Sequence, residues 1–352
     1  MVSKVQAFDI ITIKIKINFV QKKLQREMAR VCSSCRWVHN YHTSGRKCSR
    51  MKAKAHPSGD TLLEKSFKMA RMRRNASEAN IIADEFAELF AEQCSPESSK
   101  GKNADLDTSE SFDMISTKFI DESVLNIASM VNMNREQEYS QVVLLGDGTC
   151  TRFSRLPWPA GTVIYLVAPP EVHERAEAIL KGTSASAPRG SLLRRVSLNL
   201  GTSDTDLSDA LKDKGFRGDR VSVWGMNGIR ALDLSLETME HIFSEIVNCA
   251  AFESIILGEF PDVSVLDLEN FLAKYGLVGN HIPLQIVCDQ CIPEYTEHPD
   301  LMNALNMYDS REECPRLFRA TQRRVSLEEM DMYNNHVAAA EEVDEDFFGN
   351  FS

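Results

Sequence analysis

Short apolar runs alternate with amphipathic stretches along the chain from Gln141 to Val287. The apolar runs predict buried strands near residues 142–145, 163–167, 195–200, 221–224, 254–259 and 282–287. Apolar residues at helical spacing predict intervening helices near residues 171–180, 204–214, 236–247 and 265–275. This alternation predicts an α/β fold with a mainly parallel sheet and helices on both faces. In such a sheet, ligands bind at the carboxyl ends of the strands.

The residues before this alternating body carry a helical pattern. Between residues 62 and 93, apolar side chains gather on one side at Ile81, Ile82, Phe86, Leu89 and Phe90. A polar loop is expected over residues 94–111, followed by a helix over residues 119–133 with Asp121 as its N-cap. The pattern divides the chain into an N-terminal helical cap at residues 61–135 and a Rossmann-like domain at residues 136–325.

A glycine bend, Gly146-Asp147-Gly148, ends the first apolar run. Paired glycines let the backbone turn sharply and let a ligand approach the main chain closely. The same residues also form ordinary tight turns between a strand and the next element. Asp147 has the same two interpretations, because Asp tolerates the unusual backbone angles of turns and can also bind a ligand.

The residues around the bend resemble those of a known family. The run Gln141-Val-Val-Leu-Leu-Gly-Asp-Gly-Thr-Cys-Thr-Arg152, followed by Arg155-Leu-Pro-Trp-Pro-Ala-Gly-Thr162, resembles the leucine carboxyl methyltransferase-like family of S-adenosylmethionine-dependent methyltransferases. The resemblance extends over roughly residues 65–261 and includes Ala76-Ser-Glu-Ala-Asn80 in the helical cap. It implies a class I methyltransferase fold, S-adenosyl-L-methionine as cofactor, and O-methylation of a carboxylate or hydroxyl on a small molecule or protein.

The resemblance also implies a set of cofactor-binding residues, and no catalytic residue is identified with it. The set is Gly146, Asp147, Gly148, Thr151, Arg152, Lys118, Ala168 and Asn227. Four positions depart from the pattern of active relatives. Ser116 stands where an Arg would pair with the cofactor's carboxylate, which leaves Lys118 as the nearest cation. Cys150, Ala168 and Asn227 replace three acidic residues, of which the one at position 168 would hold the ribose hydroxyls.

These departures leave two functions open. A carboxylate on two ribose hydroxyls makes charge-assisted hydrogen bonds of about 1.5–3 kcal/mol each, and Ala168 makes none. The chain is therefore expected to be a methyltransferase, with a catalytically silent binding or scaffolding protein of the same fold as the alternative. A nicotinamide dehydrogenase ranks below both, because Thr151 occupies the place of the third glycine of its fingerprint.

Composition excludes several other classes. The net charge of −11 argues against general nucleic-acid binding, and no apolar run approaches the roughly twenty residues of a membrane span. Nine cysteines in 352 residues do not make a disulfide scaffold. Two Cys-x-x-Cys pairs, Cys32–Cys35 and Cys288–Cys291, lack a convincing set of further ligands, so no metal is expected.

The two ends of the chain carry opposite charge. Residues 1–60 are basic and hydroxyl-bearing, which is typical of a transit peptide, with the chloroplast as the first choice of destination and the mitochondrion or cytoplasm as alternatives. Translation is expected to start at Met28. Residues 326–352 contain no Lys or Arg, and they form an acidic tail that is expected to be solvated.

Overall fold

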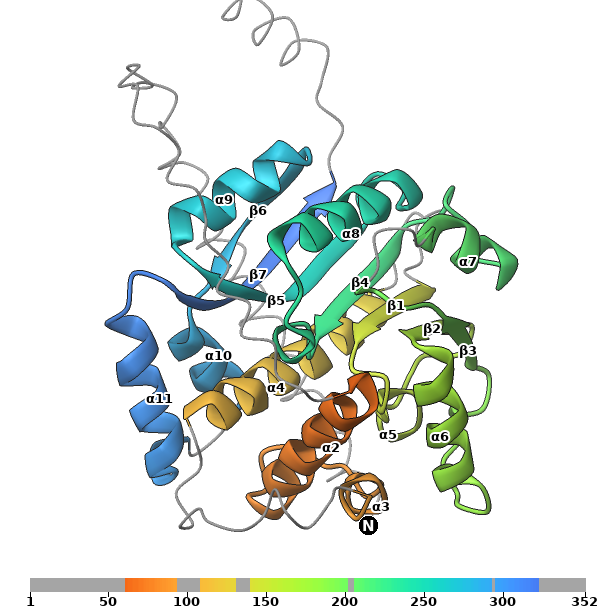
Figure 1. Ribbon diagram of the computed structural model, residues 1–352, viewed down its shortest axis with the longest axis horizontal. Helices are drawn as coiled ribbons and strands as arrows, with labels where there is room; N and C mark the ends of the chain where they lie inside the picture. The colour runs from red at the N-terminus through yellow and green to blue at the C-terminus, as the bar shows by residue number, and fades with distance from the viewer. Residues whose placement is uncertain (1–60, 94–107, 131–139, 202–205, 293–294, 323–352) are drawn as a thin grey trace, which may run out of the picture. The chain divides into compact units, whose positions relative to one another are not determined.

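A seven-stranded sheet organises the protein, in the order β3-β2-β1-β4-β5-β7-β6 (Figure 1). The computed structural model describes residues 61–93, 108–130, 140–201, 206–292 and 295–322, all within one compact unit, Ala53–Ser352. The expected transit peptide and acidic tail lie outside them. The strands are β1 (Gln141–Gly146), β2 (Val163–Ala168), β3 (Leu192–Ser197), β4 (Ser222–Asn227), β5 (Ile255–Val263), β6 (Leu277–Ile282) and β7 (Cys314–Gln322). Strands β1 to β5 pair in parallel, whereas β7 runs antiparallel between β5 and β6.

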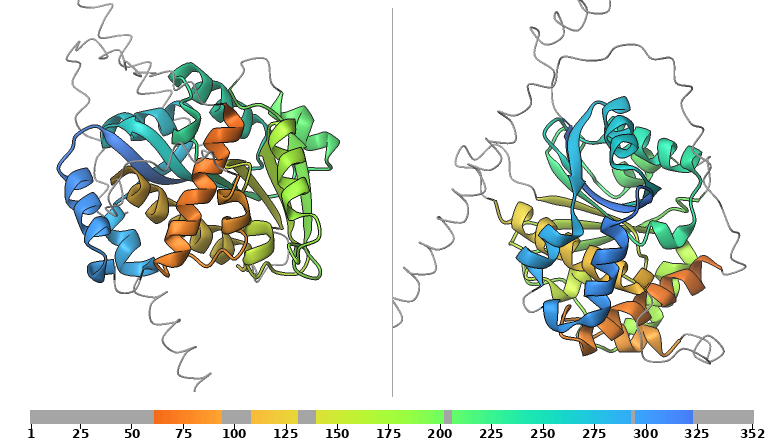
Figure 2. Two further views of the ribbon diagram at one scale, coloured as in Figure 1. Left: turned by 60° about the horizontal axis from the view of Figure 1, so that its bottom comes forward. Right: turned by 90° about the vertical axis from the view of Figure 1, so that its left-hand side faces the viewer.

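Helices cover both faces of the sheet (Figure 2). One face packs against α2 (Leu62–Glu78), α4 (Thr108–Ala128), α10 (Leu284–Cys291) and α11 (Pro299–Asp309). The other packs against α7 (Leu207–Asp213), α8 (Leu236–Cys249) and α9 (Val265–Lys274). The remaining helices are α3 (Ala87–Ala91), α5 (Arg152–Arg155), α6 (Pro170–Leu180) and the 3₁₀ turns η2 (Arg230–Leu232) and η3 (Tyr295–Glu297). None of the helices in these described ranges is long and apolar enough to cross a bilayer.

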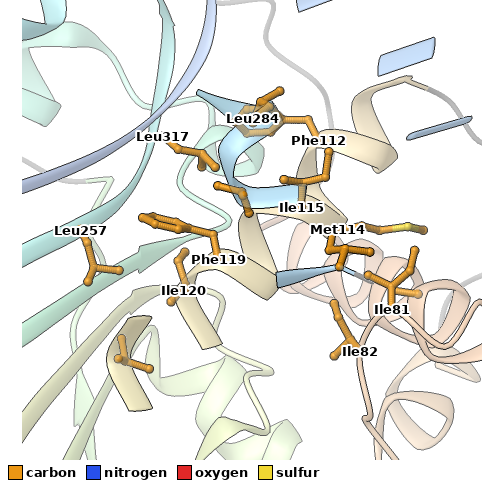
Figure 3. Close-up of a cluster of buried hydrophobic side chains, with 14 of the residues drawn as sticks. Ile81, Ile82, Phe112, Met114, Ile115, Phe119, Ile120, Leu257, Leu284 and Leu317 are labelled. Atoms are coloured by element: carbon orange, nitrogen blue, oxygen red, sulfur yellow. The ribbon is translucent and has the colours of Figure 1, made fainter. Parts of the chain in front are cut away.

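The helix α4 lies at the centre of the first face. Its residues Phe112, Ile115 and Phe119 lie in one hydrophobic cluster with Leu284 of α10 and Leu317 of β7, as Figure 3 shows. Burying each such side chain contributes about 1.5–3 kcal/mol. Because α4 crosses the sheet beside the ends of β4 and β5, its polar residues lie close to the carboxyl ends of these strands.

The sequence correctly predicted the mainly parallel α/β fold. The apolar runs near 142–145, 163–167, 221–224 and 254–259 overlap β1, β2, β4 and β5. The run at 195–200 overlaps β3, which begins three residues earlier at Leu192. Strand β3 is an edge strand with partly exposed residues, so its apolar pattern marks its bounds poorly.

The predicted strand at 282–287 was wrong. Ile282 ends β6, Pro283 caps the next helix, and α10 begins at Leu284, so both cysteines of the Cys288–Cys291 pair lie on a helix. A short apolar run does not distinguish a buried strand from a buried helix. The sequence also missed β6 and β7, which carry exposed or charged positions such as Val278 and Arg319.

The predicted bounds of the N-terminal helices also need correction. Helix α4 begins at Thr108 rather than near 119, so Asp121 lies inside the helix and is no N-cap. The helical pattern over 62–93 is divided into α2 and α3. Helix α2 starts at a capping box, in which Thr61 accepts a 3.2 Å hydrogen bond from the backbone of Glu64. It stops before Asn80, whose φ of 57° is left-handed and cannot continue a helix.

Candidate functional site

Three neighbouring strands end in a row beneath α4. Gly146 of β1 lies opposite Asn227 of β4, and Met226 lies opposite Gly258 of β5, which places Glu259 beside Asn227. Residues two or four positions earlier, such as Leu144 and Leu257, pack against α4, so the row faces the same helix. The chain order reverses between β1 and β4, and this switch point is where α/β sheets bind ligands.

The glycine bend is tightly packed. Gly146 has a φ of 103°, and an added Cβ atom would collide with the backbone oxygen of Asn227. An added Cβ atom on Gly148 would lie 2.5 Å from Cγ1 of Val172 and 2.8 Å from Cβ of Ala168. The backbone angle and the close approach of β4 therefore require glycine at position 146, and packing against α6 and β2 disfavours a side chain at position 148.

Asp147 belongs to a buried hydrogen-bond network that reaches into α2. Its Oδ1 accepts from the backbone and hydroxyl of Thr149 at 3.0 and 2.8 Å, and its Oδ2 pairs with Arg73. Arg73 also donates to Asp84 at 3.0 Å, and Thr151 donates to the same Asp84 oxygen at 2.6 Å. Burial acts to lower the pKa of Arg73, but the carboxylates of Asp147 and Asp84 outweigh it and hold the pKa above its ordinary value.

A second network joins the bend to α4 and β4. Arg152 donates to Oδ1 of Asp121 at 2.6 Å and to Oδ1 of Asn227 at 2.8 Å, while Arg155 pairs with Asp121 at 2.6 Å. Burial acts to raise the pKa of Asp121, but Arg155 and Arg152 outweigh it and hold the pKa below its usual range. In the two networks together, three buried guanidinium groups are matched by three carboxylates.

Among the described residues, four buried polar atoms in the second network or on α4 have no hydrogen-bond partner. One is Nδ2 of Asn227, because only Oδ1 of this side chain is engaged, by Arg152 and by the Thr117 hydroxyl at 3.4 Å. The others are Nε of Arg155 and, on α4, Oγ of Ser111 and Oγ of Ser116. Buried donors without partners are rare in folded proteins, and they mark places where a ligand or water completes the hydrogen bonding.

The structure brings seven of the eight expected binding residues to this edge of the sheet. They are Gly146, Asp147, Gly148, Thr151, Arg152, Ala168 and Asn227. Ala168 is buried at the end of β2. Lys118 differs, because it pairs with Glu122 at 2.9 Å within α4, and its charge acts on Cys291 of α10.

Three residues of the region were not predicted. Arg73 and Asp84 become neighbours of Asp147 only through the packing of α2, which no local pattern reveals. Glu259 was the last residue of a predicted strand, and an acid at such a carboxyl end was a usable signal. Oε1 of Glu259 accepts from the backbone of Ile229 at 2.9 Å, and its buried Oε2 has no hydrogen-bond partner within the described part of the chain. Burial, aided by Asp113, raises the pKa of Glu259 to about 8.

The sequence of this chain is similar to those of known methyltransferases. Residues 65–247 match the sequence model of the leucine carboxyl methyltransferase family. A rice (Oryza sativa subsp. japonica) protein named "O-methyltransferase 1, chloroplastic" is 29% identical over 205 residues, which cover 57% of this chain and 54% of that protein. Two proteins named "Putative S-adenosyl-L-methionine-dependent methyltransferase" are also similar. The one from Mycolicibacterium gilvum is 33% identical and the one from Mycobacterium marinum 36%, over 38% and 39% of this chain and 42% and 44% of theirs.

The chain thus spans about half the length of these relatives or less. The family match itself covers more than half of the chain, from α2 through β4 to α8, and includes the glycine bend and both buried networks. On this match, the chain belongs to the leucine carboxyl methyltransferase family.

Proposed function

We propose that this protein is an S-adenosyl-L-methionine-dependent methyltransferase that transfers the methyl group to an oxygen of a carboxylate or hydroxyl acceptor, on a small molecule or a protein. The observation that carries the proposal is the register of Gly146 against Asn227 at the switch point of the sheet, in a chain of this family. The cofactor, when bound, supplies a methyl group activated by a sulfonium.

The residues at the bend fit such a ligand. Asn227 lies opposite Gly146, and its buried Nδ2 is a donor without a partner among the described residues. The sharp turn at Gly146 brings the main chain to the carboxyl edge, where it can lie against a ligand. At the end of β2 the fit is poorer, because the side chain of Ala168 has no carboxylate to accept from the ribose hydroxyls. Main-chain groups must then bind these hydroxyls.

Methyl transfer depends mainly on the alignment of the reacting atoms. The acceptor oxygen, the methyl carbon and the sulfur must lie in line, and holding reactants in such a geometry can supply about 7–11 kcal/mol of the barrier reduction. The side chains of Arg152, Asp121 and Arg155 are buried and pair with one another next to the glycine bend, so their positions are restrained. A carboxylate acceptor needs no general base, whereas a hydroxyl acceptor must give up its proton as the methyl group is transferred.

A silent binding protein of the same fold is the second candidate. It is favoured by the replacements at Ser116, Cys150, Ala168 and Asn227. The internal pairing of Asp147 with Arg73 also favours it. The chloroplast remains the proposed location, on the basic leader and on the name of the rice relative.

Calorimetric titration of the full chain with S-adenosylmethionine and S-adenosylhomocysteine tests the proposal. We expect micromolar binding that is lost in Asn227→Leu, which removes the unpartnered donor while keeping side-chain volume. Gln322→Leu is the matched control, since it also removes a buried amide, but at the opposite edge of the sheet. Absence of heat at millimolar ligand in a folded chain would reject the enzyme and favour the silent relative.

A further inference from the structure

Two cysteines lie one turn apart at the end of α10, away from the glycine bend. Cys288 and Cys291 are both free thiols, and Cys291 is the last residue of the helix. We propose that these two thiols form a reversible disulfide by exchange with a small disulfide of the oxidised-glutathione type, which makes the end of α10 a two-electron redox site. This proposal goes beyond the methyltransferase function and does not depend on it.

The spacing of the two cysteines is that of neighbours on a helix. Residues three apart in an α-helix have Cα atoms about 5 Å apart, within the range of about 4.4–6.8 Å found across disulfides. Their Cβ atoms are about 5–6 Å apart, against about 3.5–4.5 Å in a disulfide, so the bond requires an approach on the order of 1 Å. The backbone separation therefore permits the bond, and the remaining movement has to come from the end of the helix.

The last turn of α10 is where such a movement is least costly. Ile292, which follows Cys291, leaves helical geometry at φ −122° and ψ 84°, and its N–H donates to the carbonyl of Cys288 at 3.1 Å. Because α10 ends at Cys291, rotating the backbone of this residue disturbs only the hydrogen bonds of the last turn. The same pair in the middle of a helix would have to distort the turns on both sides.

The two thiols differ in their access to solvent. Cys288 is fully buried in the hydrophobic cluster that α10 shares with α4, whereas Cys291 is partly exposed at the margin of this cluster. A small disulfide therefore reaches Cys291 first in the folded chain, and Cys288 lies one turn away as the resolving thiol. The described residues contain no group of three or more metal-binding side chains, which separates this pair from a zinc site.

The surroundings of the pair keep both sulfurs protonated at neutral pH. Burial raises the pKa of Cys288 to about 12, and Asp289 and Cys291 add to this effect. Burial and Glu122 raise the pKa of Cys291 to about 11, against the opposing charge of Lys118. Because the reduced form gains nothing from a stabilised thiolate, the disulfide resists reduction better than one in a site that stabilises its thiolate. Exchange should be faster in alkali, since the thiolate is the attacking species.

The exchange balances in two steps. The thiolate of Cys291 attacks one sulfur of oxidised glutathione, the S–S bond breaks, and its electron pair leaves on one glutathione, which takes up the proton released by Cys291. The thiolate of Cys288 then attacks Sγ of Cys291, and the second glutathione leaves with the proton released by Cys288. Two cysteine thiols are thus oxidised to one disulfide, and one glutathione disulfide is reduced to two thiols.

Peptide mapping of the full chain tests the proposal. Trypsin releases residues 275–311 as one peptide, which contains Cys288 and Cys291 and no other cysteine. The folded chain is incubated with oxidised glutathione at about pH 8, where the thiolate fraction is larger than at neutral pH, and free thiols are then alkylated in denaturant. We expect the peptide to lack two hydrogens, to carry no alkyl group, and to regain both thiols after treatment with dithiothreitol.

The same peptide reports the electron count. Mixtures of reduced and oxidised glutathione set the ambient potential. The ratio of disulfide to dithiol should change about tenfold for each change of about 30 mV, as a two-electron couple requires.

Cys249 is the matched control for burial at a helix end. It is also a buried thiol at the last position of a helix, α8, and its pKa is raised to about 11, but Ile246 occupies the place one turn earlier. Its tryptic peptide, residues 231–274, should keep a free thiol. In Cys288→Ala, Cys291 has no resolving partner and should be recovered with one bound glutathione, whereas Cys291→Ala should leave Cys288 unmodified.

Several outcomes would overturn the proposal. They are a peptide 275–311 that keeps two free thiols at every glutathione ratio, one that carries a glutathione on each cysteine, and oxidation of Cys249 to the same extent. Formation of the bond only in the urea-unfolded chain would also overturn it, because the folded helix would then prevent the reaction. The wild-type chain decides each of these outcomes, so a variant that fails to fold does not weaken the test.

Discussion

Nε of Arg152 donates a 2.6 Å hydrogen bond to Oδ1 of Asp121, in the interior between the glycine bend and α4. Asp121 also pairs with Arg155 at 2.6 Å, so one carboxylate balances two buried guanidinium groups. We therefore predict that Asp121→Asn destabilises the fold by about 3–5 kcal/mol, because it leaves buried charges uncompensated. Urea denaturation followed by circular dichroism measures this loss in the free energy of unfolding.

The direction of the pH dependence follows from the same pair. The pKa of Asp121 is held below its usual range, so its stabilisation is complete above the unfolded value of about 3.9 and is lost as the pH falls through the folded value. Asp219→Asn is the control, since it removes an exposed partner of Arg217 at a similar distance of 2.7 Å and should change stability little. Equal effects of the two substitutions would contradict the importance assigned to burial.

Gly148 provides a test of why glycine occupies the bend. We predict that Gly148→Ala destabilises the chain by about 1–3 kcal/mol, because the new methyl group meets Val172 at 2.5 Å. Adding Val172→Ala should recover part of that loss, so the double variant is more stable than the sum of the single effects. Thermal unfolding of the four chains measures the coupling.

The contrasting outcome for Gly148 is equally specific. If its glycine is needed only for the approach of a ligand, Gly148→Ala leaves the melting temperature unchanged and lowers the affinity for S-adenosylhomocysteine. In that case Val172→Ala does not restore binding.

The sequence was informative about strands that consist of a continuous apolar run. Strands β1, β2 and β4 are buried along almost their whole length, so their apolar runs mark them directly. Strands β6 and β7 contain exposed or charged positions among their buried ones, and α10 is a short apolar run that a strand could equally produce. These elements are defined by tertiary packing more than by local pattern.

The candidate site shows the same division. The bend and Asn227 follow apolar runs and could be located in advance. Arg73 meets Asp147 across 74 positions of sequence, and that meeting depends on how α2 packs on the sheet. Asp121 was expected at a helix start because it precedes an apolar stretch, but Phe112 and Ile115 extend the helix back to Thr108 and place the carboxylate in the interior.

Glu259 gives stability a pH dependence of the opposite sign to that of Asp121. Its pKa rises from 4.5 to about 8 on folding, so the folded chain retains a proton that the unfolded chain releases. The stability associated with this proton is complete below pH 4.5, falls as the pH rises toward 8, and does not fall further above it. We predict that Glu259→Gln removes this decline, worth on the order of 3–5 kcal/mol, so the variant gains stability relative to wild type over that window.

Melting temperatures of both chains at intervals across that window measure the difference for Glu259. Glu253→Gln changes an exposed residue that precedes β5, and it is a control for general charge effects. Parallel curves for wild type and Glu259→Gln would show that the buried carboxyl group is not neutral in the folded protein.

Ala168 is the place to test how the ribose end of the cofactor is held. The residue is buried at the last position of β2, in the row of strand ends that includes Gly146 and Asn227. Ala168→Asp places a carboxylate there, and we predict a roughly ten- to hundredfold tighter affinity for S-adenosylhomocysteine, equivalent to about 1.5–3 kcal/mol for a charge-assisted hydrogen bond.

Without ligand, the new carboxylate at position 168 is buried and unpaired, so the melting temperature of the Ala168→Asp chain should lie below that of wild type. S-adenosylhomocysteine should raise the melting temperature of this variant by more than it raises that of wild type. Ala168→Asn has nearly the same volume but no charge, and it should show a smaller gain in affinity. Tighter binding combined with a lower melting temperature of the free chain is specific to a carboxylate that has hydrogen-bond partners only when the ligand is bound. If affinity is unchanged while the free chain loses stability, the nucleoside does not lie against the end of β2, and main-chain groups of the bend must hold the cofactor elsewhere along the edge.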